Sequence, residues 1–350
     1  MQYLELNYTP IQSVKKKFNI ERIVKMKIKL AAIIYLTAGL IAQNIHHGKI
    51  VFSSANPFSF KDVITDLDNQ DVQEVFGILK LPENTSRDVT VKYPLVIGVA
   101  GSLGWGEQHF EYLEMYREMG IATFELNSFK SRGISSTVGS QISVTTAMMV
   151  LDSYRAFEVL SQHPQIDADK VAITGWSLGG AVTLFSSWLP LKNAINQELK
   201  FTAHLAFYPP CFIKPALLEF TNSPIHILIG ELDNWTPADA CEELVPELQG
   251  EGVNIGLTVY ENSHHSFDRE GSLIFIENGY SFTDCRLKMR ADGAVVMNFF
   301  NFPMTTPFLQ KIGLSFCAER GVNYGGNPAA RKKAFQFARE FMGQHLLSDK

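Results

Sequence analysis

The sequence predicts an α/β protein with a mainly parallel sheet that is covered by helices on both faces. Residues 94–100 (PLVIGVA) form a continuous apolar run, which is typical of a strand buried on both faces. Segments with helical length and periodicity alternate with such runs, and helical crossovers between strands imply a parallel sheet. A third observation is a glycine-rich turn at residues 175–180, which lies between a short apolar run and an amphipathic stretch.

Apolar runs bounded by turn residues define the expected strands. These strands cover residues 72–81, 94–100, 121–126, 171–174, 201–208, 225–230 and 253–260. Helical spacing of apolar side chains predicts helices at residues 107–119, at 141–162, directly after Ser177, and at 329–347. Residues 268–325 interrupt the alternation with turns and an aromatic-rich stretch (Phe299, Phe300, Phe302). We interpret them as an irregular excursion, a lid or a wall of the site, within one α/β domain spanning residues 44–350.

Composition and charge exclude two classes of protein. Of the 350 residues, 46% are apolar and 19% are charged, which excludes a globally disordered chain. The net charge is −5, but residues 1–29 hold seven basic and two acidic side chains, so the remainder carries −10. Nucleic-acid binding requires a basic face that neutralises phosphates, so no nucleic-acid partner is expected.

The N-terminus has the pattern of a signal peptide. Residues 30–42 (LAAIIYLTAGLIA) are thirteen uncharged residues directly after a basic stretch, too few for a spanning helix of about 20 residues. Residues 1–43 are therefore expected to direct export to the periplasm or the exterior, with Met26 as a possible true start. The alternatives are an uncleaved membrane anchor or a buried N-terminal helix.

An exported protein can carry disulfides, and the chain has four cysteines. Four cysteines allow three pairings. Cys211 and Cys241 each follow a strand at the carboxyl rim of the expected sheet, on neighbouring elements, so a bridge between them is predicted. Cys285 and Cys317 would then pair by elimination. The alternative is four reduced, buried thiols.

The turn at residues 175–179 (GWSLG) matches the pattern G-x-S-x-G. In this pattern a strand turns sharply into a helix and exposes a strained serine, here Ser177, at the bend. Small residues on both sides allow the neighbouring backbone to approach. Because the turn follows an apolar strand and opens a helix, we predict that Ser177 is a nucleophile rather than part of a structural tight turn.

A serine nucleophile needs a base and a carboxylate that orients the base, in the chain order Ser, Asp or Glu, His. Asp233 follows the expected strand 225–230 and is the predicted acid, with Glu231 as the rival. His264 and His265 follow the next strand, where the base is expected. A surface pair or half of a metal site is the alternative, but no spacing completes a metal shell.

The loop after the first buried strand, residues 100–106 (AGSLGWG), has three glycines that allow the backbone to approach a ligand. The backbone N–H groups of Ser102 and Leu178 are the predicted oxyanion donors. The loop lacks the P-loop pattern, so phosphate binding is not expected. Neither a cofactor nor a metal is expected.

These residues resemble the dienelactone hydrolase family of α/β-hydrolases. The matching segments, in the family's order, are 127–133 (NSFKSRG), 175–180 (GWSLGG), 208–211 (YPPC), 230–237 (GELDNWTP) and 264–267 (HHSF). The resemblance implies the α/β-hydrolase fold and assigns the base to His265. Lys130 and Arg132 are candidates to bind a substrate carboxylate, with solvated loop charges as the alternative, and Trp176 is a further candidate substrate contact.

The expected function is an exported serine hydrolase that cleaves a carboxylic ester or lactone through an acyl-enzyme. Its partner would be a small-molecule ester or lactone, and it would meet a membrane only through an uncleaved N-terminal segment. One alternative is a binding protein that keeps the fold without turnover. Another is a peptidase or acyltransferase that uses the same three residues.

Overall fold

An eight-stranded sheet organises the chain in the computed structural model, which describes residues 48–83, 90–297 and 300–348. The strands are β1 (Gly48–Ala55), β2 (Val72–Lys80), β3 (Tyr93–Val99), β4 (Ala122–Leu126), β5 (Ile166–Trp176), β6 (His204–Phe207), β8 (Ile225–Gly230) and β9 (Ile255–Tyr260). Their order is β1-β2-β4-β3-β5-β6-β8-β9. The first three in this order pair antiparallel and the others pair parallel. The predicted fold class is therefore confirmed, and the sheet is that of an α/β hydrolase.

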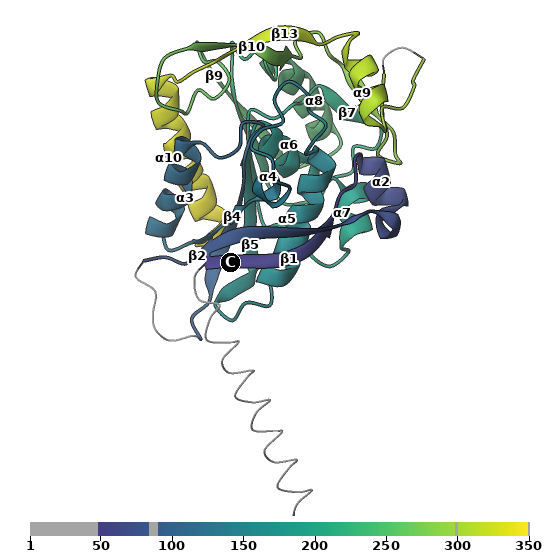
Figure 1. The fold of residues 1–350 in the computed structure, drawn as a ribbon. Helices are drawn as coiled ribbons and strands as arrows, with labels where there is room; N and C mark the ends of the chain where they lie inside the picture. The colour runs from purple at the N-terminus through teal and green to yellow at the C-terminus, as the bar shows by residue number, and fades with distance from the viewer. Residues whose placement is uncertain (1–47, 84–89, 298–299, 349–350) are drawn as a thin grey trace, which may run out of the picture. The chain divides into compact units, whose positions relative to one another are not determined.

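Helices cover both faces of this sheet (Figure 1). Their bounds are α2 (Phe60–Thr65), α3 (Glu107–Glu118), α4 (Ser128–Ser131), α5 (Thr146–Leu160), α6 (Leu178–Phe185), α7 (Leu189–Ile195), α8 (Ala238–Gly250) and α10 (Pro328–Leu346), with a 3₁₀ turn at Leu67–Asn69. Helices α3 and α10 lie on one face, whereas α5 and α6 lie on the other. The central strands are buried from both sides, as the continuous apolar run of β3 predicts.

Element ends differ from the sequence-based prediction where local capping or pairing decides them. The helix expected at residues 141–162 begins at Thr146, because the side chain of Thr145 accepts a hydrogen bond from the N–H of Met148. Strand β5 begins at Ile166, earlier than expected, because Ile166 pairs with Tyr93 of β3. Strand β1 was not predicted. It lies at the sheet edge with several exposed residues, so it lacks a continuous apolar run.

Residues 268–325 are more regular than their sequence indicates. Strand β10 (Ile274–Ser281) pairs antiparallel with β13 (Glu319–Tyr324), and both lie at the top of Figure 1. A second small sheet joins β12 (Val295–Val296), β11 (Leu287–Met289) and β7 (Ile213–Pro215), and α9 (Pro307–Leu314) follows it. A Cys285–Cys317 disulfide ties this segment together. Phe300 and Phe302 are exposed.

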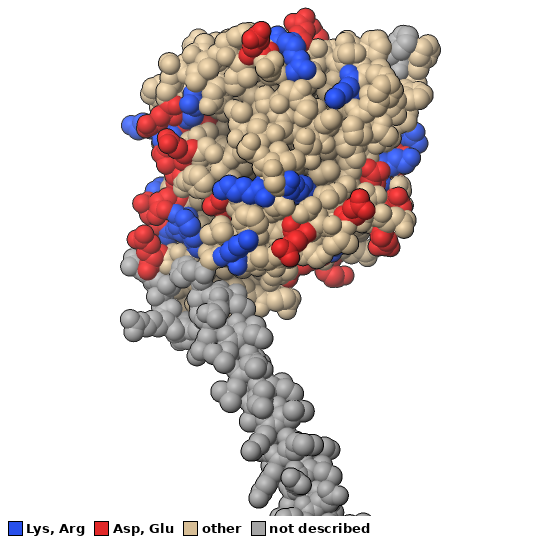
Figure 2. Space-filling view, viewed as in Figure 1, with Lys and Arg blue, Asp and Glu red and all other residues tan. Residues whose placement is uncertain are grey.

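Several expectations concern residues outside the described ranges. These are the signal peptide at residues 1–43 with its possible start at Met26, and the position of Phe299. Within the described ranges, no helix combines the length and apolar character needed to cross a membrane. Figure 2 shows positive and negative side chains interspersed on the face in view, where no extended basic patch is present.

The core contains His204 of β6, a fully buried residue whose pKa burial lowers from 6.5 to about 3. Below pH 6.5 the unfolded chain takes up a proton that the folded chain does not, so His204 makes stability fall as the pH falls. Between pH 7.5 and pH 4.5, the unsubstituted protein should lose about 3 kcal/mol more of its free energy of unfolding than a His204→Phe variant loses. Urea unfolding at both pH values measures this difference, and parallel pH dependence of the two proteins would contradict it.

Candidate active site

Ser177 lies at a sharp turn between the last residue of β5 and the first residue of α6. Its backbone has φ 57° and ψ −112°, a conformation that a non-glycine residue adopts only when its surroundings impose it. The N–H of Ser177 donates to the carbonyl of Phe207 on the neighbouring strand, at 2.9 Å. Pairing with β6 and the start of α6 thus hold the strained serine at the carboxyl end of the sheet.

The glycines around this turn are required by close backbone approach. A Cβ on Gly179 would lie 2.1 Å from the carbonyl oxygen of Val99, and one on Gly175 would lie 2.2 Å from that of Gly179. Neither position has room for a side chain. The chain after β3 therefore packs directly against the turn that carries Ser177.

Ser177, His265 and Asp233 form one hydrogen-bonded series. His265 Nε2 lies 2.9 Å from Ser177 Oγ, and His265 Nδ1 lies 2.7 Å from Asp233 Oδ2. Asp233 comes from the loop after β8 and His265 from the loop after β9. All three side chains are buried. Glu231, the rival acid, is exposed and accepts from the N–H of Asn262, so the structure brings Asp233 to the histidine instead.

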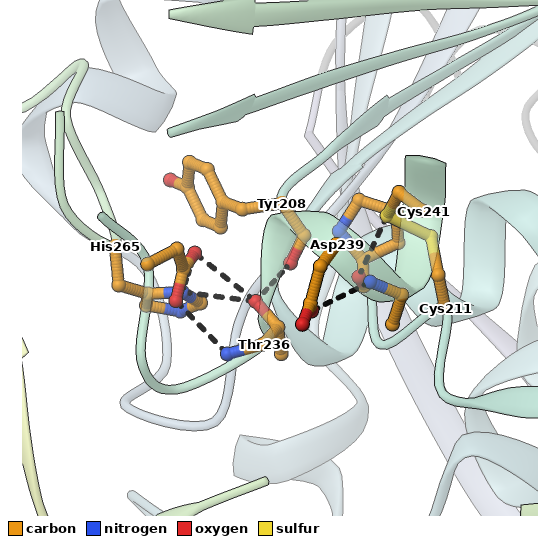
Figure 3. The surroundings of a disulfide bond; sticks show 9 residues. Tyr208, Cys211, Thr236, Asp239, Cys241 and His265 are labelled. Carbon is orange, nitrogen blue, oxygen red and sulfur yellow. Dashed lines mark hydrogen bonds and ion pairs between the residues drawn. A yellow bond between two sulfur atoms is a disulfide. The ribbon is translucent and has the colours of Figure 1, made fainter. Parts of the chain in front are cut away.

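Asp233 is held by donors from its own loop. Its Oδ1 accepts hydrogen bonds from the N–H groups of Trp235 and Thr236, both at 2.9 Å. The Thr236 hydroxyl lies 3.2 Å from Asp233 Oδ2 and 3.1 Å from His265 Nδ1, and it donates to the carbonyl of Tyr208 at 2.9 Å. Figure 3 shows Thr236 between His265 and the helix that carries Cys241. Sequence reasoning missed this contact, although Thr236 stands in the quoted segment 230–237.

A disulfide between Cys211 and Cys241 joins the chain after β6 to the start of α8 (Figure 3). The Cα atoms are 4.9 Å apart. This pair and the Cys285–Cys317 pair are the ones that the sequence analysis expected. Because α8 begins directly after the Asp233 loop, the bridge anchors that loop to the neighbouring strand.

A second buried carboxylate, Asp268, lies three residues after His265 and was not singled out from the sequence. It accepts a hydrogen bond from the Tyr208 hydroxyl at 3.0 Å, and burial raises its pKa to about 6. The Tyr208 ring in turn packs on the imidazole of His265, with ring centroids 4.6 Å apart. The histidine is therefore packed from the side by a tyrosine that Asp268 fixes.

Ser102 and Leu178, the predicted oxyanion donors, both lie beside Ser177 and line the same cavity. The turn that carries Ser102 packs closely on the serine turn, since a Cβ on Gly101 would lie 2.9 Å from the carbonyl oxygen of Trp176. The carbonyl of Ser102 accepts from the N–H of Thr137 at 2.9 Å, which ties the peptide between Ser102 and Leu103 to a neighbouring loop.

Two cavities meet at Ser177. One, of about 160 Å³, has walls of apolar and uncharged polar side chains and includes Leu178. The other, of about 390 Å³, includes His265 together with charged side chains such as Glu111 and Arg269. A substrate at Ser177 thus meets an apolar environment on one side and a polar one on the other.

Of the three candidate substrate contacts, Arg132 and Lys130 line neither cavity at Ser177, whereas Trp176 borders the polar one. The guanidinium of Arg132 is buried in an ion pair with Asp152, at 2.7 Å, so it is not free to bind a substrate carboxylate. Lys130 is exposed on α4 and lines neither cavity. Trp176 borders the polar cavity, but its side chain is fully buried and stacks on His109. Trp176 therefore packs beneath the polar cavity as part of the buried core.

Arg269 is a cavity residue that the sequence analysis did not identify. Its guanidinium lies over the ring of Tyr324, with the central carbon 4.3 Å from the ring centroid. Its Nη1 is buried and has no hydrogen-bond partner among the described residues. The only sequence signal for Arg269 was its proximity to the predicted base, since it follows His265 by four residues. In the described part of the chain, no three His, Cys, Asp or Glu side chains are grouped as a metal site requires.

Residues 115–285 match the model of the dienelactone hydrolase family, and this segment holds Ser177, Asp233 and His265. A curated relative from Bradyrhizobium sp., a probable 2-oxo-3-(5-oxofuran-2-ylidene)propanoate lactonase, is 26% identical over 142 residues. That match covers 38% of this chain and 56% of the relative, so the chain spans just over half of the relative's length.

Two solved structures are similar in fold. A putative dienelactone hydrolase from Klebsiella pneumoniae has 18% identity and a TM-score of 0.45, covering 63% of this chain and 89% of its own. A dienelactone hydrolase-like promiscuous phosphotriesterase from metagenomic libraries has 13% identity and a TM-score of 0.48, covering 85% and 99%. From the match over the segment that carries the serine, the acid and the histidine, we assign residues 115–285 of this chain to the dienelactone hydrolase family.

Proposed function

We propose that this chain is an exported serine hydrolase that cleaves a carboxylic ester or lactone through an acyl-enzyme at Ser177. The observation that carries the proposal is the buried series from Ser177 Oγ through His265 to Asp233 on a strained strand-to-helix turn. A nucleophile, a base and a group that orients the base are the components that acyl transfer needs. The name of the Bradyrhizobium relative, a probable lactonase, agrees with this reaction class.

In the proposed reaction, His265 Nε2 removes the proton from Ser177 Oγ as the oxygen attacks the substrate carbonyl carbon. Asp233 accepts the Nδ1–H hydrogen bond, which selects the correct tautomer and stabilises the imidazolium. The backbone N–H groups of Ser102 and Leu178 stabilise the oxyanion of the tetrahedral intermediate, and such a donor contributes about 2.7–4 kcal/mol.

Collapse of the intermediate breaks the bond to the leaving oxygen, and His265 returns the proton to that oxygen. A water molecule then attacks the acyl-enzyme by the same steps, with His265 again as the base. The acid is released and Ser177 recovers its proton. The polar cavity on the His265 side gives that water a route to the acyl carbon.

A serine-reactive fluorophosphonate tests the nucleophile directly. We expect one labelled peptide, modified at Ser177, and no labelling of a Ser177→Ala variant. Ser161→Ala, which lines neither cavity, should label like the unsubstituted protein. Labelling at another serine, or labelling that persists in Ser177→Ala, would overturn the assignment. A labelled protein without turnover of any ester would instead favour a binding role.

Export is supported by the signal-like pattern at residues 30–42 and by the two disulfides. Expression of the full chain followed by cell fractionation and N-terminal sequencing tests it. We expect mature protein outside the cytoplasm that begins near Gln43. A full-length chain in the cytoplasm with four free thiols would contradict export.

A further inference from the structure

The two cavities at Ser177 contain different parts of the catalytic machinery. Leu178 lines the apolar cavity but not the polar one, and His265 lines the polar cavity but not the apolar one. We propose that the apolar cavity takes the acyl group and the polar cavity takes the leaving alcohol. The substrate would then be an ester of a compact apolar acid, no larger than a phenyl ring, with a polar alcohol. This inference rests on the proposed function and assigns its substrate class.

The direction of proton transfer determines which part of the ester lies on which side. After attack, the leaving oxygen must accept a proton from His265 Nε2, so the alcohol has to lie on the face where the imidazole is reached. That face opens into the polar cavity. The carbonyl oxygen is directed toward the N–H groups of Ser102 and Leu178, which leaves the acyl chain the space bounded by the side chain of Leu178.

The apolar cavity has the size and lining of a small acyl pocket. Its volume is about 160 Å³, and no charged side chain lines it. An apolar protein cavity of about 150 Å³ stays dry and binds benzene. A benzoyl group or a chain of roughly six carbons matches this volume, and we expect longer chains to be disfavoured.

The far wall of this cavity comes from the segment between β10 and β13. The wall side chains are Phe282, Leu287, Val295, Met304, Gln310 and Leu314. Three connections fix this wall: the Cys285–Cys317 disulfide, the pairing of Leu287 with Ile213, and the hydrogen bond from Gln310 Nε2 to the carbonyl of Gln141 at 2.9 Å. Because the wall is tied on three sides, the acyl chain should meet a sharp length limit.

The polar cavity has different properties that suit an alcohol. It is larger, about 390 Å³, and its lining includes Glu107, Glu111, Arg269 and Glu270. A long apolar alcohol placed there would desolvate charged groups without replacing their hydrogen bonds, which is unfavourable. The same alkyl chain is therefore favoured as part of the acid and disfavoured as part of the alcohol.

Isomeric esters separate the two arrangements. Ethyl hexanoate and hexyl acetate contain the same atoms, but only the first places its long chain on the acyl side. We expect kcat/KM for ethyl hexanoate to exceed that for hexyl acetate at least about tenfold, since each buried methylene contributes about 0.8 kcal/mol, or roughly fourfold. Equal values, or a preference for hexyl acetate, would overturn the assignment.

Variants of the wall test which residues set the limit. With p-nitrophenyl esters from acetate to decanoate, and the benzoate, kcat/KM should rise to about hexanoate and then fall at least about tenfold. Leu314→Ala should move this limit to octanoate, whereas Val295→Phe should shorten it and slow butanoate and benzoate more than acetate. The matched control is Phe308→Ala, because Phe308 lies on α9 but is 69% exposed and lines no part of the cavity.

The acetate rates distinguish a failed pocket assignment from a failed function. Acetate turnover that needs Ser177, with length profiles unchanged in Leu314→Ala and Val295→Phe, would refute the acyl pocket and leave the hydrolase intact. Absence of Ser177-dependent turnover of every ester would refute both. A profile that moves with the alcohol chain rather than the acyl chain would reverse the assignment.

Discussion

Replacing Ser177 with alanine should lower kcat about a million-fold on any ester that the protein cleaves, leaving only the rate that the oxyanion donors and binding supply. In the proposed reaction this hydroxyl forms the bond to the acyl carbon. Its partner His265 Nε2 lies 2.9 Å away, and both side chains are buried. His265→Ala should cost about as much, since a neutral serine hydroxyl is a poor nucleophile. Asp233→Asn should cost less, about 10⁴-fold.

The three losses should not add. A Ser177→Ala/His265→Ala double variant is expected to be no slower than Ser177→Ala alone, because the residues act as one unit. Steady-state kinetics with p-nitrophenyl acetate, corrected for spontaneous hydrolysis, provides the measurement, and thermal unfolding checks that each variant is folded. More than about 1% of the activity remaining in Ser177→Ala would show that another group is the nucleophile.

The sequence predicts the sheet, and the proximity of Ser177, Asp233 and His265, for a physical reason. Buried parallel strands need continuous apolar runs, and the serine turn needs glycines at Gly175 and Gly179, where a Cβ would lie only 2.2 and 2.1 Å from a backbone oxygen. Both requirements leave local patterns in the sequence. The acid was predicted because Asp233 follows a strand whose carboxyl end shares a rim with Ser177. The export signal at residues 1–43 remains a prediction.

The features that the sequence does not predict depend on long-range contacts. The far wall of the apolar cavity is formed by six side chains between residues 282 and 314. Their spacing in the sequence follows no recognisable motif. Thr236 and Asp268 act through partners that only the folded loops bring close. An arginine in a loop near the site is a reasonable candidate to bind a carboxylate. Only the folded structure shows that the guanidinium of Arg132 is already paired with the buried carboxylate of Asp152.

That ion pair connects three elements of the fold. Arg132 follows α4, and its guanidinium contacts both carboxylate oxygens of Asp152 on α5, at 2.7 and 3.1 Å. It also donates to the carbonyl of Ala55 at the end of β1, and Ser54 donates to Asp152 at 2.6 Å. Both charged side chains are nearly inaccessible to solvent, at 5% and 0% exposure. The network therefore joins the edge strand β1 to helix α5.

We expect Asp152→Ala to lower the free energy of unfolding by about 3–5 kcal/mol, because it leaves the buried guanidinium of Arg132 without a counter-charge. The control lies on the same helix: Arg155 pairs with Glu158 at 2.8 Å but is 33% exposed, so Arg155→Ala should cost less than about 1 kcal/mol. Urea unfolding followed by circular dichroism, with both disulfides intact, compares the two variants.

An Arg132→Met/Asp152→Leu double variant separates an unpaired charge from lost packing. If the cost of Asp152→Ala comes from a stranded charge, removing both charges should restore much of the lost stability, since apolar side chains fill the space without a desolvation penalty. Neither residue lines the cavities at Ser177, so the folded double variant should keep its ester turnover. A double variant as unstable as Asp152→Ala would mean that shape and hydrogen bonding, rather than charge, hold β1 against α5. A loss of turnover in the folded double variant would instead return Arg132 to the role of a substrate-binding residue.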